Sequence, residues 1–185
     1  MIDVKLLGDR IRFYRMKLGL TQTELAEKIL TAVAMAQLKL DLPVIVHTNA
    51  KKENGLWALD IILSQGVSPR AVTVSHLSDT DNIDYIKAIA AHGCYLGLDR
   101  HYDEQSAGYA EEKIRIINEL CAAGYAGQIL LSHDALFFNG FSNDPLAINP
   151  TPRFHYIFEH ILPAFSKEQI KKFMADNPLN MLGCR

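Results

Sequence analysis

Four side chains able to bind a metal ion stand at the ends of four short apolar runs. They are His47, His76, Asp99 and Asp134. Neutral imidazole nitrogens and carboxylate oxygens are donors that zinc and similar divalent ions bind in proteins. A metal held in this way lowers the pKa of a bound water toward about 7 and supplies hydroxide at neutral pH. Asp134 can accept the proton that the attacking water gives up, so these residue types predict metal-dependent hydrolysis.

Each of these side chains closes a segment with the pattern of a buried parallel strand. The expected strands cover residues 43–47, 71–76, 94–99 and 128–134. The expected helices between them cover about 55–65, 81–92 and 110–123, and a glycine follows each. Successive βα units of this kind predict an α/β fold with a parallel sheet. In a barrel of such units the carboxyl ends of the strands meet on one face, which would bring the four side chains together.

A purely structural interpretation of the same residues stays open. A single histidine at a strand end is more often a hydrogen-bonded structural residue than a metal ligand, and Asp99 with Arg100 could form an ion pair that caps the sheet. Four consecutive strand ends that each carry a ligand-type residue favour the metal site.

The composition excludes several classes of protein. Of the 185 residues, 49% are hydrophobic, and the formal net charge is −2. A core of useful size is therefore available, while no strong overall field draws the molecule to nucleic acid or to an acidic membrane. Cys94, Cys121 and Cys184 show no C-x-x-C spacing, which predicts reduced thiols and a cytoplasmic location. No apolar run has the length of a signal peptide or a membrane span.

Five separated motifs match one known family in order and spacing. They are Leu42-Pro43-Val44-Ile45-Val46-His47-Thr48, Val74-Ser75-His76, Gly97-Leu98-Asp99-Arg100, Leu130-Leu131-Ser132-His133-Asp134 and Asn177-Pro178. Through them, residues from about 32 to 182 resemble the C-terminal half of the phosphotriesterase family, which includes organophosphate hydrolases and lactonases. The resemblance implies strands five to eight of a (β/α)8 TIM-type barrel, hence a partial barrel.

The resemblance also implies roles for the site residues. His47 and His76 would bind the more exposed of two divalent ions, usually zinc. Asp134 would bind the buried ion and shuttle a proton, while Asp99 and Arg100 would line the substrate pocket. Asp134 and Arg100 are the expected catalytic residues. The expected reaction is attack of metal-activated water on a phosphoester, ester or lactone.

Part of the family's metal site has no counterpart in this sequence. No histidine precedes His47, so the strand-one His-x-His pair is missing. The bridging lysine is unassigned, and Lys17, the candidate, lies in a segment expected to be helical. Weak or absent activity is therefore expected. A half barrel would leave two open sheet edges, which a second copy could pair or a partner chain supplying the missing half could complete. The long segment 135–152 after the fourth strand is expected to act as a substrate lid.

The first thirty residues have a different pattern. A basic amphipathic helix is expected at 6–18, and Thr21 with Glu24 predicts a capping box that starts a second helix. The run Gly19-Leu20-Thr21-Gln22 followed by Leu25-Ala26 resembles the first two helices of a lambda-repressor/Cro-type helix-turn-helix domain, cut off before its recognition helix. We therefore divide the chain into residues 1–30 and 31–185. Weak DNA binding, and an inactive fusion or remnant, are the alternative functions.

Overall fold

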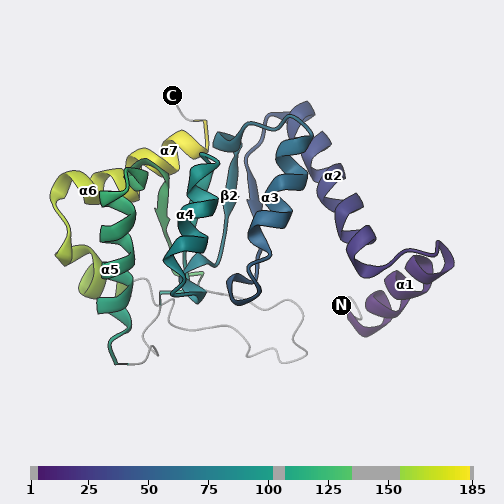
Figure 1. The fold of residues 1–185 in the computed structure, drawn as a ribbon, viewed down its shortest axis with the longest axis horizontal. Helices are drawn as coiled ribbons and strands as arrows, with labels where there is room; N and C mark the ends of the chain where they lie inside the picture. Colours follow the sequence, from purple (N-terminus) through teal and green to yellow (C-terminus); the bar gives the residue numbers. More distant parts are fainter. Residues whose placement is uncertain (1–3, 102–106, 135–154, 184–185) are drawn as a thin grey trace.

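A four-stranded parallel sheet forms the centre of the computed structural model, which describes residues 4–101, 107–134 and 155–183. Its strands follow the chain in the order β1-β2-β3-β4 (Figure 1). They are β1 (Val44–Val46), β2 (Val72–Val74), β3 (Tyr95–Leu98) and β4 (Ile129–Leu131). Each strand lies inside its predicted range, and the parallel α/β arrangement is confirmed.

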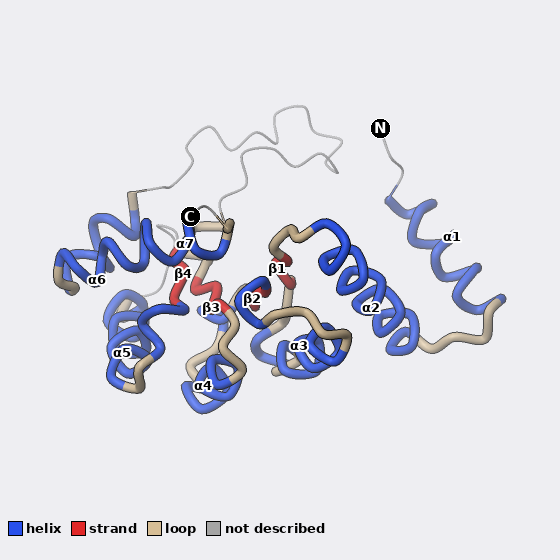
Figure 2. Tube along the Cα trace, turned by 90° about the horizontal axis from the view of Figure 1, so that it is seen from above, coloured by secondary structure: helices blue, strands red, loops and turns tan. Residues whose placement is uncertain are grey.

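Three helices connect the strands and cover one face of the sheet, as the view along the strands shows (Figure 2). They are α3 (Gly55–Ser64), α4 (Ile83–Ala91) and α5 (Tyr109–Ala122). Short turns of helix complete the connections at η1 (Ala50–Lys52), η2 (Pro69–Ala71), η3 (Leu77–Asp79) and η4 (Tyr125–Gln128). The glycine after each helix has a positive φ, between 86° and 91°, as expected for the residue that ends a helix.

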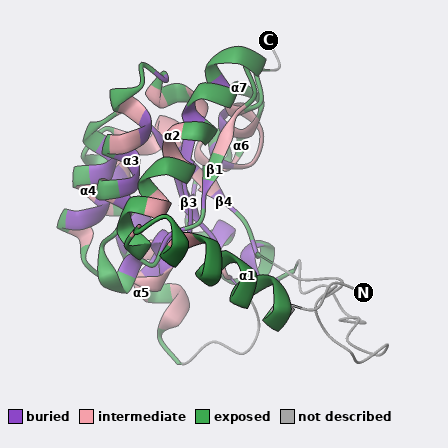
Figure 3. Ribbon diagram, turned by 90° about the vertical axis from the view of Figure 1, so that its right-hand side faces the viewer, coloured by how far each residue is buried: buried purple, intermediate pink, exposed green. Residues whose placement is uncertain are grey.

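The hydrophobic core lies between the sheet and these helices (Figure 3). Side chains of a strand alternate between its two faces, so Val72, Val74, Leu96 and Leu98 point one way and are buried in this core. The opposite face carries smaller and more polar residues, among them Thr73, Ser75, Gly97 and Ser132. The alternation therefore gives the sheet one apolar face and one face suited to chemistry.

The C-terminal segments lie beside β4. They are η5 (Ile157–Ile161), η6 (Leu162–Ala164), α6 (Lys167–Lys171), η7 (Lys172–Asp176) and α7 (Asn177–Met181). Ser166 forms the capping box that starts α6. The buried amide of Asn177 donates hydrogen bonds to the carbonyls of Ala126 and Ile129, at 2.9 and 2.7 Å, and so fixes α7 against β4. The predicted lid at 135–152 and Cys184 lie outside the described residues.

Two helices precede the sheet. They are α1 (Val4–Lys17) and α2 (Gln22–Leu40), and the capping box of Thr21 and Glu24 is present at the start of α2. α2 packs against α3 and buries Ala34 and Gln37, and it continues without a break through residues 30 and 31. α1 projects beyond α2, away from the sheet (Figure 1). Within the described ranges, no helix combines the length and apolar character that crossing a membrane requires.

Candidate active site

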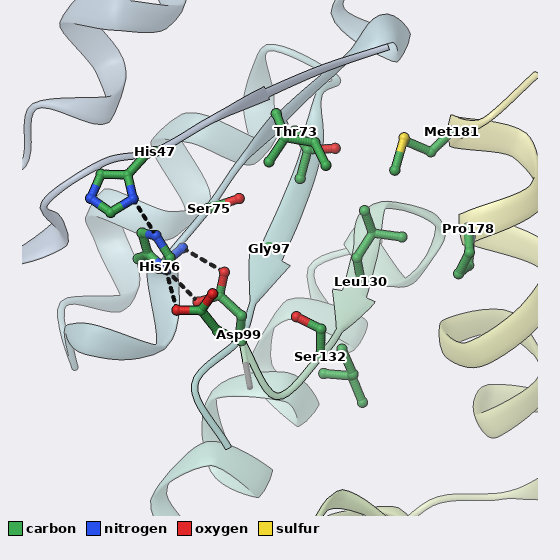
Figure 4. Close-up of a pocket in the computed structure, with 13 residues that line it drawn as sticks. His47, Thr73, Ser75, His76, Gly97, Asp99, Leu130, Ser132, Pro178 and Met181 are labelled. Atoms are coloured by element: carbon green, nitrogen blue, oxygen red, sulfur yellow. Dashed lines mark hydrogen bonds and ion pairs between the residues drawn. The ribbon is translucent and has the colours of Figure 1, made fainter. Parts of the chain in front are cut away.

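Two imidazole rings from neighbouring strands meet at the carboxyl end of the sheet. His47 follows β1 and His76 follows β2, and Nδ1 of His47 lies 2.8 Å from Nε2 of His76. The rings are edge to face, with centroids 4.3 Å apart (Figure 4). His76 is 5% exposed, whereas His47 is open to solvent. The parallel pairing of β1 with β2 brings these two side chains together as predicted.

Asp99 fixes the orientation of His76. One carboxylate oxygen lies 3.0 Å from Nδ1 of the ring, and the other accepts the backbone N–H of His76 at 3.1 Å. A neutral ring that donates from Nδ1 to Asp99 has no proton on Nε2, so the lone pair of Nε2 points toward His47. Burial raises the pKa of Asp99, while the charge and hydrogen bonds of His76 act in the opposite direction. This carboxylate–histidine pair is the arrangement that usually orients a metal-binding imidazole.

The backbone is left-handed at three of these strand ends. The φ angles are 67° at His76, 67° at Arg100 and 50° at Asp134. Left-handed conformations are costly for residues with a Cβ and occur where the surrounding structure requires a particular side-chain direction. At these three positions the chain turns sharply as it leaves the sheet, so the three side chains remain at the carboxyl ends of the strands.

Arg100 joins two carboxylates at the same end of the sheet. Its Nε donates to Asp134 at 3.1 Å, and its Nη1 donates to Asp79, the last residue of η3. Partial burial alone would lower the pKa of Arg100, but the hydrogen bonds and charges of Asp134 and Asp79 raise it. Asp134 also lies 3.9 Å from Nδ1 of His76, which connects the ion pairs to the histidines.

A second buried histidine supports the turn that carries Asp99 and Arg100. His101 is completely buried, with Nε2 3.0 Å from the carbonyl oxygen of Leu98 and Nδ1 3.1 Å from the hydroxyl of Tyr109. Desolvation lowers its pKa to about 3. His101 is therefore neutral at physiological pH and acts as a structural support for the turn.

A pocket of about 460 Å³ opens beside the histidines on the polar face of the sheet. Gly97 forms part of its floor, and a Cβ at this position would lie 3.0 Å from Cα of Ser75. Thr73 also lines it, and the buried Oγ1 of Thr73 has no hydrogen-bond partner among the described residues. The rest of the wall is mainly apolar and includes Ile45. Leu130, Pro178 and Met181 also line it (Figure 4).

The donor set fits one divalent ion held by two imidazoles. With bonds of about 2.1 Å, the nitrogens of two ligands in a tetrahedral site stand about 3.4 Å apart. The observed 2.8 Å between His47 and His76 therefore requires only a small opening of the rings. Asp134 turns toward Arg100 and the Nδ1 side of His76. Within the described ranges, no group of three or more His, Cys, Asp or Glu side chains is arranged to hold a metal.

The structure adds residues that the sequence analysis did not single out. Asp79 pairs with Arg100, and the buried hydroxyl of Thr48 donates to the carbonyl of Ser75 at 2.6 Å, which ties the end of β1 to the end of β2. The sequence feature that could have pointed to them is proximity along the chain, because Asp79 lies three residues after His76 and Thr48 directly follows His47. Lys17, the candidate bridging lysine, is the last residue of α1, which lies apart from the sheet (Figure 2).

Comparison with known proteins identifies the family. The sequence profile of the Phosphotriesterase family matches residues 17–182. The chain belongs to the phosphotriesterase family. A phosphotriesterase homology protein of Mycobacterium tuberculosis is 30% identical over 159 residues, which are 82% of this chain and 48% of that protein. An aryldialkylphosphatase of Saccharolobus solfataricus is 38% identical over 119 residues, covering 60% of this chain and 35% of that protein.

Solved phosphotriesterase-family structures share the fold. The phosphotriesterase from Mycobacterium tuberculosis superimposes with a TM-score of 0.67 at 28% identity, covering 84% of this chain and 50% of that one. A variant of an organophosphorus hydrolase from Deinococcus radiodurans has a TM-score of 0.72 at 23% identity, covering 89% of this chain and 52% of that one. This phosphotriesterase-family chain therefore spans about half the length of its relatives.

Proposed function

We propose that this chain contributes the metal-binding and substrate-facing residues of a hydrolase that cleaves phosphoester, ester or lactone bonds with metal-activated water. The observation that carries the proposal is the facing pair of nitrogens, Nδ1 of His47 and Nε2 of His76, with Asp99 behind the buried ring. Similarity to an aryldialkylphosphatase supports the substrate class.

Each of the residues at the carboxyl end of the sheet has a distinct role in the proposed reaction. A bound divalent ion, zinc by analogy with the family, would supply hydroxide at neutral pH. His47 and His76 would hold it, and Asp99 keeps the proton of His76 on Nδ1. Asp134 would accept the proton of the attacking water, and Arg100, which donates to Asp134, would hold that carboxylate at the mouth.

We further propose that β1 to β4 correspond to strands five to eight of a (β/α)8 barrel. The parallel order of the strands and the coverage of about half of each relative support this assignment. The donors of strands one and four have no counterpart here, and the bridging lysine stays unassigned. We therefore expect the chain by itself to bind one ion and to hydrolyse ester substrates weakly or not at all.

Hydrolysis assays on the metal-loaded chain test the function. Paraoxon and a γ-lactone would be assayed with the chain after dialysis against zinc or cobalt, beside a chain with His47→Asn. Slow turnover that depends on metal and disappears in the variant supports the proposal. Turnover that survives both the variant and a chelator contradicts it, because the activity would then come from elsewhere.

DNA binding by residues 1–30 is the second candidate. Two helices joined by a short turn, with Arg10, Arg12 and Lys17 exposed on the first, support it. Contact through these cations alone would be weak and sensitive to salt. Gel-shift titration at physiological salt tests the idea, and nanomolar, sequence-dependent binding would make DNA recognition the main function.

A further inference from the structure

The sheet has two edge strands, and the chain covers neither edge fully within the part that the structure describes. β1 pairs with β2 alone and β4 pairs with β3 alone. Every residue of β2 and β3 is buried, whereas Ile45 at the centre of β1 is 63% exposed. An apolar β-branched residue at the centre of a parallel strand is normally buried, since such sheets are covered on both faces.

The backbone of β1 shows which groups are left at its edge. The N–H of Ser75 donates to the carbonyl of Val46 at 3.0 Å, so Val46 directs its peptide groups toward β2. Neighbouring residues of a strand direct their peptide groups to opposite sides, so the N–H and C=O of Ile45 face the open edge. An exposed edge of this kind is a template for another strand.

At the edge of β4, as at the edge of β1, peptide groups of the strand face away from the sheet. The N–H of Ser132 donates to the carbonyl of Leu98 at 3.2 Å, so the peptide groups of Leu131 face away from β3. The side chain of Asn177 covers the carbonyl of Ile129, one position earlier on that side of the strand. β1 and β4 are each three residues long, and the peptide groups of Leu131 remain open at the edge of β4 as those of Ile45 do at the edge of β1.

Large apolar side chains are exposed on β1, on the segment before it and on the C-terminal half of α2. Five large side chains are at least 52% exposed there: Met35, Leu38, Leu40, Leu42 and Ile45. At roughly 100 Å² each they present about 500 Å², a large share of the roughly 800 Å² that each partner buries in a standard specific interface. The edge thus offers apolar surface, as well as hydrogen-bonding groups, to a protein partner.

Part of the inner face of the sheet is open among the described residues, although Pro178 and Met181 of α7 line its pocket. Oγ1 of Thr73 is buried without a hydrogen bond among the described residues, and it lies on the face that carries the pocket. Leaving such a group unsatisfied costs about 1–3 kcal/mol. A polar group brought close to Thr73 by whatever covers this face would remove that cost, and Ile45 and Leu130 on the same face offer apolar contacts.

We propose that two copies of this chain associate about a two-fold axis parallel to the strands, with β1 of each copy pairing in parallel with β4 of the other. Four strands from each copy complete the eight that close a parallel βα barrel. A second copy fits because it presents the β4 edge that the β1 edge requires and, by symmetry, the reverse. The inner faces then cover each other and bring Ser75 and Ser132 of one copy to the same interior as Thr73 of the other.

The dimer would also change the candidate site, because the partner copy would add side chains to it. This consequence rests on the proposed function. All eight strands point the same way, so the mouth of the closed barrel holds the His47 and His76 pairs of both copies. The partner copy supplies donors at the positions where a single chain has none. Association itself does not depend on any metal.

Sedimentation equilibrium of the full chain in the presence of EDTA tests the proposal. The expected mass is twice the 20.7 kDa of one chain. Ile45→Pro removes the edge N–H without touching the pairing with β2, and Ile45→Lys places a charge on the inner face. Each change occurs twice in the dimer, so we expect dissociation constants at least about tenfold higher. Phe13→Lys, on the exposed face of α1, is the matched control and leaves the dimer intact.

Cross-linking identifies the contact directly and separates it from other dimers. A chain with Ile45→Cys is mixed with a chain carrying Leu130→Cys, and the mixture is oxidised. We expect a disulfide-linked dimer of the two variants, in a larger amount than any cross-linked dimer that the parent chain forms under the same conditions. Circular dichroism verifies that each variant is folded. A monomer at high micromolar concentration overturns the proposal. The proposal is also overturned if Phe13→Lys dissociates the dimer while the Ile45 variants leave it intact, because α1 would then make the contact. Because EDTA is present, none of these results depends on whether the chain is a hydrolase.

Discussion

Nδ1 of His47 and Nε2 of His76 lie 2.8 Å apart although 29 positions separate them in the sequence. Parallel pairing of β1 with β2 produces this proximity, and Asp99 on the next strand fixes which nitrogen of His76 is free of a proton. Three neighbouring strands therefore bring two imidazoles and a carboxylate together through their register alone.

Asp99→Asn should weaken metal binding without unfolding the chain. The amide would keep the size of the side chain but would lose the negative charge that orients the Nδ1 proton of His76. Loss of such a partner typically reduces metal affinity about 10–100-fold. Cobalt titration followed by absorbance measures the change, with Asp60→Asn on the exposed side of α3 as the control. Equal affinities in the two variants would mean that Asp99 has no role in orienting the ring.

Arg100→Lys should lower activity more than stability. A lysine can reach Asp79 or Asp134 but cannot hold both carboxylates with a planar fork. Because these ion pairs are partly exposed, we expect a loss of less than about 1 kcal/mol in unfolding free energy. Metal-dependent hydrolysis should fall at least about tenfold, since the position of Asp134 is lost. A large loss of stability with unchanged activity would instead favour the purely structural ion-pair interpretation.

Gly97→Ala should destabilise the sheet. The new methyl group would lie 3.0 Å from Cα of Ser75 and 3.1 Å from the carbonyl oxygen of Val74, and backbone atoms cannot move aside easily. Overpacking of this kind costs about 1–3 kcal/mol. Gly8→Ala is the control, because its methyl group meets nothing within 4 Å and lies within the helix α1, where alanine is favoured. Urea denaturation of both variants gives the comparison, and a neutral Gly97→Ala would contradict the close packing of β2 on β3.

Stability should fall on acidification because His101 is buried as a neutral ring. Its pKa in the folded chain is lowered to about 3, below the ordinary value of 6.5. The unfolded chain therefore binds the extra proton first, and this part of the stability is complete above pH 6.5 and is lost as the pH falls toward 3. The slope is about 1.4 kcal/mol per pH unit for one proton. Between pH 7 and pH 5, the free energy of unfolding from urea denaturation should therefore fall more in wild type than in His101→Gln, each compared with its own value at pH 7.

The control for this prediction is His92→Gln, a change at an exposed histidine that follows α4. It should leave the pH dependence of wild type unchanged. If His101→Gln keeps the full wild-type slope, the acid sensitivity belongs to other groups and the buried ring does not stay neutral.

Much of the fold could be predicted because the information is local. The β-branched runs that became β1 to β4, the glycines after the helices, and the capping box at Thr21 depend on neighbours within a few residues. The meeting of His47 with His76 also followed from the sequence, since parallel strands bring their carboxyl ends together. The helix-turn-helix interpretation of residues 1–30 stays a prediction.

The detailed geometry of the site could not be read from the sequence. The left-handed backbone of His76, the choice of Nδ1 by Asp99 and the pairing of Arg100 with Asp79 depend on residues brought together from different strands and turns. Asp134 illustrates the same limit. Its position at a strand end was evident, but its turn toward Arg100 depends on a contact 34 positions away.

Metal content of the purified chain tests the central claim most directly. The chain, and a chain with both His47→Asn and His76→Asn, would be dialysed against zinc, washed, and analysed by inductively coupled plasma mass spectrometry. One ion held per chain by wild type and none by the double variant is the predicted result. A wild-type chain that holds no zinc, or a double variant that holds as much, would contradict the claim that these two imidazoles form a metal site.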